Sequence, residues 1–101
     1  MLPSEHLHKI QSNYAYLLRE LDTLHSGLLD RLVNDDVLKL HEKMQVDVLT
    51  LPHKRCEKLL SILRRKTQKE YELFLQALDA TNQSHIAYVL KLEGSFSIFG
   101  M

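Results

Sequence analysis

The stretch that decides the fold is residues 52–78, which read PHKRCEKLLSILRRKTQKEYELFLQAL. Pro52 suits the first position of a helix, where its missing N–H costs nothing. The next apolar residues fall at i, i+3, i+4 and i+7, which is the spacing of one helix face: Cys56, Leu59, Leu60 and Leu63. Arg64, Arg65 and Lys66 follow, and cations favour the negative end of a helix dipole. We therefore predict a helix that ends near residues 64–66.

A second helix begins directly after this one. Thr67 and Glu70 have the spacing of a capping box, in which each side chain pairs with the other's backbone N–H. The helix behind it would bury Tyr71, Phe74, Leu75 and Leu78. Residues 79–83 connect it to a last helix, which starts at Ser84, runs through Ile86, Val89 and Leu90, and ends at Gly94. Residues 95–101 would form a tail.

Towards the N-terminus the same helical period continues. One apolar stripe predicts a first helix over 5–22, with Ser4 as its N-cap: Leu7, Ile10, Tyr14, Leu17, Leu18 and Leu21. A short second helix would contain Leu28, Leu29, Leu32 and Val33 and end at residues 34–36, whose side chains compete for backbone hydrogen bonds. A weaker third helix would have Lys39 as its N-cap and turn Leu40, Met44 and Val48 inward.

These patterns together predict an all-α protein with six helices. The chain has 101 residues, which is one domain, and only five Gly and Pro residues. No segment alternates with the period of a strand. Because the connectors are short, neighbouring helices should pack antiparallel around one core. We assign the bundle to residues 1–92 and a C-terminal tail or linker to residues 93–101.

Composition excludes several classes of protein. Lys and Arg number 13 and Asp and Glu 13, whereas a general nucleic-acid binder has an excess of cations. No apolar run approaches the ~20 residues that span a membrane, and the first residues lack the pattern of a signal peptide. A single cysteine allows no internal disulfide, which fits a reducing compartment. We expect a cytoplasmic protein without membrane contact.

The balanced net charge conceals a polarised distribution. Residues 20–51 carry seven acids and three bases, whereas residues 52–69 carry seven bases and one acid. Such runs are often only solvated faces. The alternative is a head-to-tail contact, in which the basic face of one copy meets the acidic face of another and the assembly can propagate.

The residues that usually carry chemistry are sparse. Six histidines and one cysteine offer no four-ligand zinc spacing, so we expect no metal. Cys56 lies on an apolar stripe, where a buried hydrophobic role is favoured, although a nucleophilic Cys–His pair needs only to meet in space. There is no glycine-rich phosphate loop and no nucleophile elbow. We expect no cofactor and no enzymatic activity.

Five stretches together resemble a caspase recruitment domain, or CARD, of the death-fold superfamily. They are residues 28–33 (LLDRLV), 37–38 (VL), 56–66 (CEKLLSILRRK), 71–78 (YELFLQAL) and 81–90 (TNQSHIAYVL). The resemblance is strongest to the CARDs of initiator caspases and their adaptors, and it covers about residues 7–91. Thr67 and Gln68 replace the glycine that the family has between its fourth and fifth helices. Lys39 replaces the family's Ser or Thr at the start of the third helix.

The resemblance implies a six-helix death-fold (Greek-key) bundle and a noncatalytic module that binds other CARDs. In this family a basic patch on helices 1 and 4 meets an acidic patch on helices 2 and 3. The corresponding basic residues here are Lys9, Arg19, Lys54, Arg55 and Lys58. The acidic residues are Asp30, Asp35, Asp36, Glu42 and Asp47. A secondary interface would contain the 49–51 connector together with Arg64, Arg65, Lys66 and Lys69.

The function that follows is CARD–CARD binding that recruits or assembles caspase and adaptor complexes, such as an apoptosome or inflammasome, in apoptosis or innate immunity. The partner would be a second copy, a caspase, an adaptor or a receptor, and a higher-order oligomer is expected. The alternative is a small helical nucleic-acid-binding domain that uses the basic patch of the fourth helix. The acidic second and third helices count against that alternative, because they would repel phosphates.

Overall fold

The first helical segment is broken at Asn13. The computed structural model describes residues 1–92, and in it α1 (Ser4–Ser12) and α2 (Tyr14–Glu20) replace the single helix predicted over 5–22. The Asn13 side-chain amide donates to the carbonyl of Lys9 at 2.9 Å, and this carbonyl also accepts the Asn13 backbone N–H. An asparagine side chain that competes for a helix carbonyl is a known cause of helix interruption. The predicted N-cap is also wrong, because Pro3 occupies that position and Ser4 is already helical.

The remaining five helices lie close to their predicted positions. They are α3 (Leu28–Asn34), α4 (Leu40–Asp47), α5 (Pro52–Leu63), α6 (Gln68–Ala80) and α7 (Ser84–Lys91). The all-α prediction is therefore confirmed, and residues 1–92 contain seven helices in place of six because of the break at Asn13. The predicted helix end at Gly94, the tail 95–101 and the 93–101 segment lie outside the described residues.

Local signals account for where these helices begin and end. Pro52 is the first residue of α5, and Lys39 is the N-cap of α4, as predicted. At the start of α6, Thr67 Oγ1 accepts from the Glu70 N–H at 3.2 Å and Glu70 Oε1 accepts from the Thr67 N–H at 2.9 Å, which confirms the capping box. After α3, Asp36 has a φ of 61°, a left-handed conformation that Asp tolerates better than most residues. This conformation ends the helix at the predicted place.

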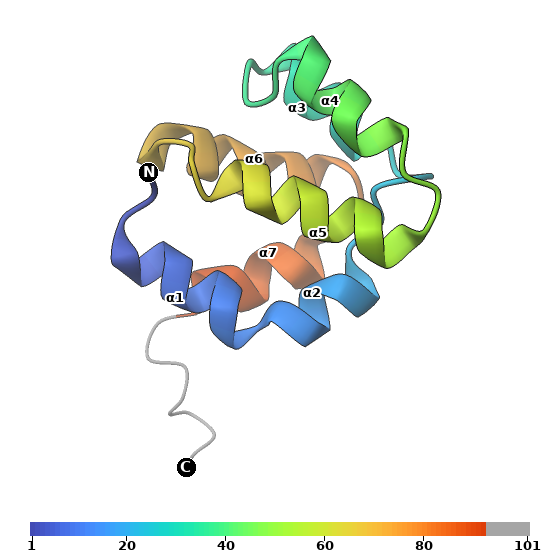
Figure 1. The fold of residues 1–101 in the computed structure, drawn as a ribbon. Helices are drawn as coiled ribbons and strands as arrows, with labels where there is room; N and C mark the ends of the chain where they lie inside the picture. The colour runs from blue at the N-terminus through green and yellow to red at the C-terminus, as the bar shows by residue number, and fades with distance from the viewer. Residues whose placement is uncertain (93–101) are drawn as a thin grey trace.

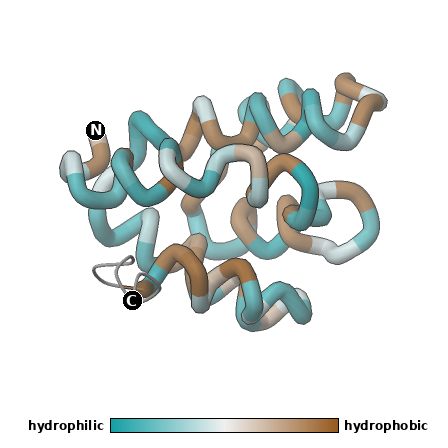
Figure 2. The backbone as a smooth tube through the Cα atoms, turned by 90° about the horizontal axis from the view of Figure 1, so that it is seen from below, coloured by the Kyte–Doolittle hydropathy of each residue, from teal (hydrophilic) through white to brown (hydrophobic). Residues whose placement is uncertain are grey.

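The helices form three layers around one core (Figure 1). The pair α5 and α6 runs through the middle, with α3 and α4 on one side and α1, α2 and α7 on the other. The fully buried large side chains come from every helix except α4: Ile10, Leu17, Leu28, Leu32, Leu59, Leu60, Ile62, Leu63, Tyr71, Phe74, Leu78 and Ile86. Figure 2 shows that hydrophobic and hydrophilic segments alternate along each helix, as one-sided burial requires.

The predicted inward face of α4 is wrong. Leu40, Met44 and Val48 are 65%, 58% and 73% exposed, whereas Val46 is completely buried. The helix packs on α3 and α5 through its other side. Both sides of this short helix carry apolar residues, and only the position of the neighbouring helices decides which side is buried.

Candidate protein-interaction surfaces

Arg55 is part of the protein interior, although the sequence analysis placed it on an exposed basic face. Its side chain is 4% exposed and its guanidinium makes five hydrogen bonds. Nε donates to Thr23 Oγ1 at 3.1 Å and Nη2 to the Thr23 carbonyl at 2.8 Å. Nη1 donates to the carbonyls of Val46 and Leu49 at 3.3 and 3.2 Å. Arg55 therefore ties α5 to the connector before α3 and to the end of α4, and it is not available to a partner.

Asp47 is the ionic partner of this arginine. Its Oδ1 accepts from Arg55 Nη2 at 3.2 Å, and its Oδ2 pairs with Lys43 one helical turn away. The pKa of Asp47 lies below its ordinary value, chiefly because Lys43 donates a hydrogen bond to the carboxylate. Burial acts in the opposite direction, and the hydrogen bond from Arg55 lowers the pKa as well. Asp47 thus stays ionised, but its charge is balanced within the chain. It contributes little to an acidic face.

Glu42 and Lys66 were predicted on different surfaces, the acidic face and the secondary interface, yet they bind each other. Lys66 Nζ lies 2.8 Å from Glu42 Oε1, and the two side chains are 12% and 14% exposed. The same carboxylate accepts from the Lys39 N–H at 2.9 Å. This pair links α4 to the loop between α5 and α6. Neither residue is therefore a free charge for a partner.

The acidic charges that remain accessible lie on and after α3. Asp30 has a side chain that is 81% exposed, with Lys43 Nζ 3.6 Å away. Asp36 is exposed at the end of the same helix. Asp35 is bound by Arg31 at 2.9 Å, which lowers the pKa of its carboxyl despite an opposing effect of burial. Asp30 and Asp36 are the principal members of this accessible acidic face.

The accessible basic charges on α5 flank a shallow recess. Lys54 and Lys58 line it together with Leu49, Glu57 and Ser61, and its volume is about 300 Å³. Lys54 Nζ lies 3.5 Å from Glu57, whereas no acid of residues 1–92 is within ion-pair distance of Lys58. Lys58, beside the apolar side chain of Leu49, can therefore pair with a carboxylate from outside these residues. We call this recess, with its two lysines, the Lys54–Lys58 recess.

The other predicted basic residues are spread over the molecule. Lys9 of α1 lines a different pocket, between α1, α6 and α7, and so does not join the α5 lysines. Arg19 of α2 is exposed, lies 5.6 Å from the centre of the Tyr16 ring and pairs with Glu20 at 3.3 Å. Helix α2 packs on α5, but no contact within residues 1–92 places Arg19 beside the α5 lysines.

The predicted secondary interface divides in a similar way. Arg65 and Lys69 are exposed. Arg64 is half-buried, with its guanidinium 5.8 Å from the centre of the Tyr14 ring, and Lys66 is held by Glu42. Two of the four predicted cations therefore remain fully accessible.

Sequence reasoning missed an exposed apolar stripe. Leu40, Met44 and Val48 form a row along α4, and Leu51 beyond it is also more than half exposed. Their i, i+4, i+8 spacing was visible in the sequence, but it had the same form as a core face. Apolar rows at the surface often mark contacts between proteins.

Cys56, the remaining candidate for a nucleophile, is unreactive in the folded chain. Cys56 is completely buried, and its thiol donates to the Leu17 carbonyl at 3.4 Å. Burial, with a smaller effect of Glu57, raises the pKa of the thiol to about 12. Such a thiol is not a nucleophile at neutral pH. The predicted role of Cys56 as a small core residue is confirmed.

No three His, Cys, Asp or Glu side chains among residues 1–92 are placed to share a metal ion. None of the helices in this part of the chain has the length and apolar character needed to cross a membrane.

The fold and these surfaces define a small helical protein-interaction domain. A family model, described as caspase recruitment domain, matches residues 7–93, and the chain therefore belongs to the CARD family. A comparison with curated proteins gives no match. Family membership confirms the death-fold assignment made from the sequence. It also implies homotypic protein–protein interaction with other CARD-containing proteins in apoptotic or inflammatory signalling.

Proposed function

We propose that this chain is a noncatalytic CARD that assembles head to tail: the Lys54–Lys58 recess of one CARD binds the acidic face formed by Asp30 and Asp36 of the next. Residues 1–92 form the interaction domain and residues 93–101 a tail or linker, and the assembly takes place in the cytoplasm. The observation that carries the proposal is the recess, because it places Lys54 and Lys58 beside Leu49 on α5, and Lys58 has no acidic partner within residues 1–92.

The arrangement of the helices supports two separate faces. Helix α4 packs against both α3 and α5, so the accessible acids on α3 and the accessible lysines on α5 have a helix between them. Internal pairing has already neutralised the charges at the boundary, through Arg55 with Asp47 and Lys66 with Glu42. Two faces that cannot satisfy each other within one chain can do so between chains, which gives a heterologous and propagating contact.

The domain would act by raising the local concentration of the segments attached to it. A CARD that binds through two faces brings the segments attached to successive copies, such as a caspase, close together. Complementary charge mainly sets the rate of encounter and the choice of partner. At physiological salt such exposed charges act over about 8 Å, so assembly should weaken as salt is raised.

The nucleic-acid alternative loses support. It required a basic patch that included Arg55, and this residue is buried and fully hydrogen-bonded. We do not propose it as a function.

The test combines two charge reversals that damage different faces. Lys58→Glu keeps the acidic face, and Asp30→Lys keeps the basic recess. Each variant alone should remain monomeric in size-exclusion chromatography with light scattering, at concentrations where the native chain assembles. Mixed together, they should form a one-to-one complex that grows no further, because only one intact contact is left. Raised salt should dissociate it.

Matched controls separate this effect from a change of net charge. Lys91→Glu and Asp79→Lys alter a surface ion pair on the other side of the bundle, where the two groups lie 3.5 Å apart. Both control variants should assemble like the native chain. Normal assembly of Lys58→Glu or Asp30→Lys, with circular dichroism unchanged, would refute the head-to-tail contact. If the native chain alone stays monomeric, the same variants are to be tested against a second CARD.

A further inference from the structure

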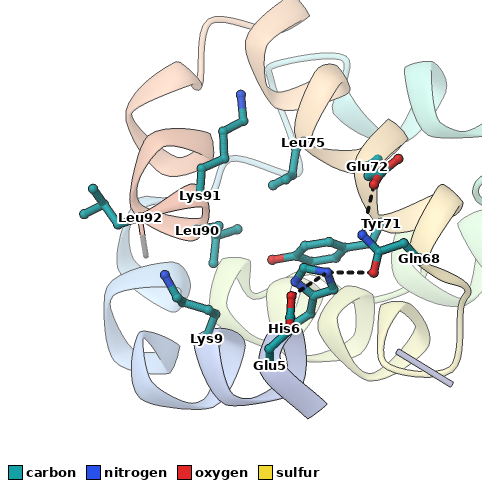
Figure 3. A pocket seen from close by; sticks show the side chains of 10 residues that line it. All are labelled: Glu5, His6, Lys9, Gln68, Tyr71, Glu72, Leu75, Leu90, Lys91 and Leu92. Carbon is teal, nitrogen blue, oxygen red and sulfur yellow. Dashed lines mark hydrogen bonds and ion pairs between the residues drawn. The ribbon is translucent and has the colours of Figure 1, made fainter. Parts of the chain in front are cut away.

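A larger pocket lies between α1, α6 and α7, away from the two charged faces (Figure 3). Its volume is about 520 Å³, which is in the range of small-molecule sites. Leu75 and Leu90 form an apolar wall. The rings of His6 and Tyr71 stack with their centres 4.5 Å apart and close one side. We call it the Tyr71 pocket.

The Tyr71 hydroxyl is buried without a hydrogen-bond acceptor from residues 1–92. The residue is 1% exposed, and its hydroxyl has no hydrogen-bond partner among residues 1–92. A buried hydroxyl without a partner destabilises the fold, because it has lost its bond to water without a replacement. In Figure 3 the hydroxyl points away from Gln68, towards the part of the pocket bordered by Lys9 and Leu90. Burial raises the pKa of this phenol to about 12, so the group is a donor at neutral pH.

The charges at the rim leave one cation without a counterion. Glu72 accepts from Gln68 Nε2 at 2.9 Å, and Glu5 lies 3.9 Å from His6. Lys91 lies 3.5 Å from Asp79. Lys9, by contrast, has no ion-pair partner within residues 1–92. The pocket therefore presents an ammonium group and a hydroxyl donor, both without acceptors among residues 1–92, beside an apolar wall.

We propose that the Tyr71 pocket binds a small organic carboxylate with an apolar body. The carboxylate accepts from the Tyr71 hydroxyl and pairs with Lys9, while the apolar body packs on Leu75 and Leu90. An amine is disfavoured because it would stand beside the Lys9 ammonium and would leave the Tyr71 hydroxyl without an acceptor. A dianion such as a phosphate is disfavoured because one cation is free and the wall is apolar. The site is independent of the proposed CARD contact, whose residues lie on α3 and α5.

The experiment uses the full chain, labelled with ¹⁵N, and three eight-carbon probes kept below their aggregation concentrations. Octanoate should give saturable amide shifts confined to α1, α6 and α7. Octanamide and octylamine should bind about tenfold more weakly, which corresponds to about 1.4 kcal/mol. Tyr71→Phe should weaken octanoate binding about fivefold or more and leave the fold intact, because it removes only the unpaired hydroxyl.

Tyr71→Phe and Lys9→Gln separate the contributions of the hydroxyl and the ammonium group to binding, and two other variants serve as controls. Lys9→Gln should remove most of the preference for octanoate over octanamide. Tyr88→Phe alters an exposed tyrosine and Lys69→Gln an exposed lysine, and neither residue lines the pocket. Both should bind octanoate like the native chain.

Several results would overturn the proposal. Equal binding of octanoate and octanamide would show apolar adsorption only, and an unchanged affinity of Tyr71→Phe would leave the hydroxyl without a role. Shifts of the pocket amides on simple dilution would assign the pocket to a second copy of the chain. The same amides shifting in the ligand-free chain on Phe96→Ser would assign it to residues 93–101.

Discussion

Arg55 Nη2 donates to the backbone carbonyl of Thr23 at 2.8 Å, across 32 residues of sequence. Together with the four other hydrogen bonds of the same guanidinium, this bond joins α5 to the connector before α3 and to the end of α4. The carbonyls of Thr23 and Leu49 accept from this guanidinium, and the Val46 carbonyl accepts from it as well as from the Leu49 N–H. Arginine suits this place because its donors form a rigid planar fork.

Replacement of Arg55 should therefore affect stability before it affects binding. We expect Arg55→Ala to lower the free energy of unfolding by about 2–4 kcal/mol, because it leaves buried carbonyls without donors. Arg55→Lys should recover only part of this loss, since an ammonium cannot reach all five acceptors. Urea unfolding followed by circular dichroism measures both variants. Lys54→Ala, one residue away and exposed, is the control and should change stability by less than about 0.5 kcal/mol. Equal stability of Arg55→Ala and Lys54→Ala would contradict the structure.

The Glu42–Lys66 pair should make stability depend on pH. Burial tends to raise the pKa of Glu42. The hydrogen bond from the Lys39 N–H and the interactions with Lys66 together outweigh burial, so the pKa lies below the ordinary value of 4.5. A carboxyl whose pKa is depressed in the folded state stabilises the fold above its unfolded pKa, and this contribution disappears as pH falls through the folded pKa. The contribution is thus complete above about pH 5 and lost in more acidic solution.

The variant Glu42→Gln isolates this contribution. We expect it to be less stable than the native chain by about 1–3 kcal/mol near neutral pH, and the difference to shrink as pH falls below 4.5. Urea unfolding at a series of pH values gives the comparison. Glu72→Gln, which alters an exposed carboxylate of α6, is the control for general charge effects. A difference that stays constant with pH would show that the pair does not stabilise the fold through its charge.

Two substitutions on α4 decide which of its sides is the core. Met44→Gln should change the free energy of unfolding by less than about 0.5 kcal/mol, because Met44 is more than half exposed. Val46→Ala should lower it by about 1–3 kcal/mol, because Val46 is completely buried. Thermal and urea unfolding provide the measurement. The reverse order would restore the inward face expected from the sequence.

The thiol of Cys56 should react only when the chain unfolds. It is completely buried and its pKa is raised to about 12, so the thiolate is scarce and inaccessible at pH 8. A chromogenic disulfide reagent at that pH should label the unfolded chain in urea at least about a hundredfold faster than the native chain. Cys56→Ser serves as the blank. Rapid labelling of the native chain would mean that α5 is less well packed than described.

The sequence by itself determined the helical class, the positions of five helices and most of the core. These features depend on local signals, such as the spacing of Cys56, Leu59 and Leu63, the proline at residue 52 and the Thr67–Glu70 capping box. The same local reasoning wrongly predicted one unbroken helix at the start of the chain. The break comes from the Asn13 side chain, which competes for a single backbone carbonyl, and this competition does not alter the spacing of the apolar residues.

Only the tertiary structure decided which charges are accessible and which are paired within the chain. Arg55, Asp47, Glu42 and Lys66 are charged in the sequence like any surface residue, but each has an opposite charge brought to it from another segment of the chain. Whether a charge is free or compensated depends on distances between helices, and a linear pattern does not contain them. For the same reason, Leu40, Met44 and Val48 could be recognised as a stripe from the sequence but not as an exposed one.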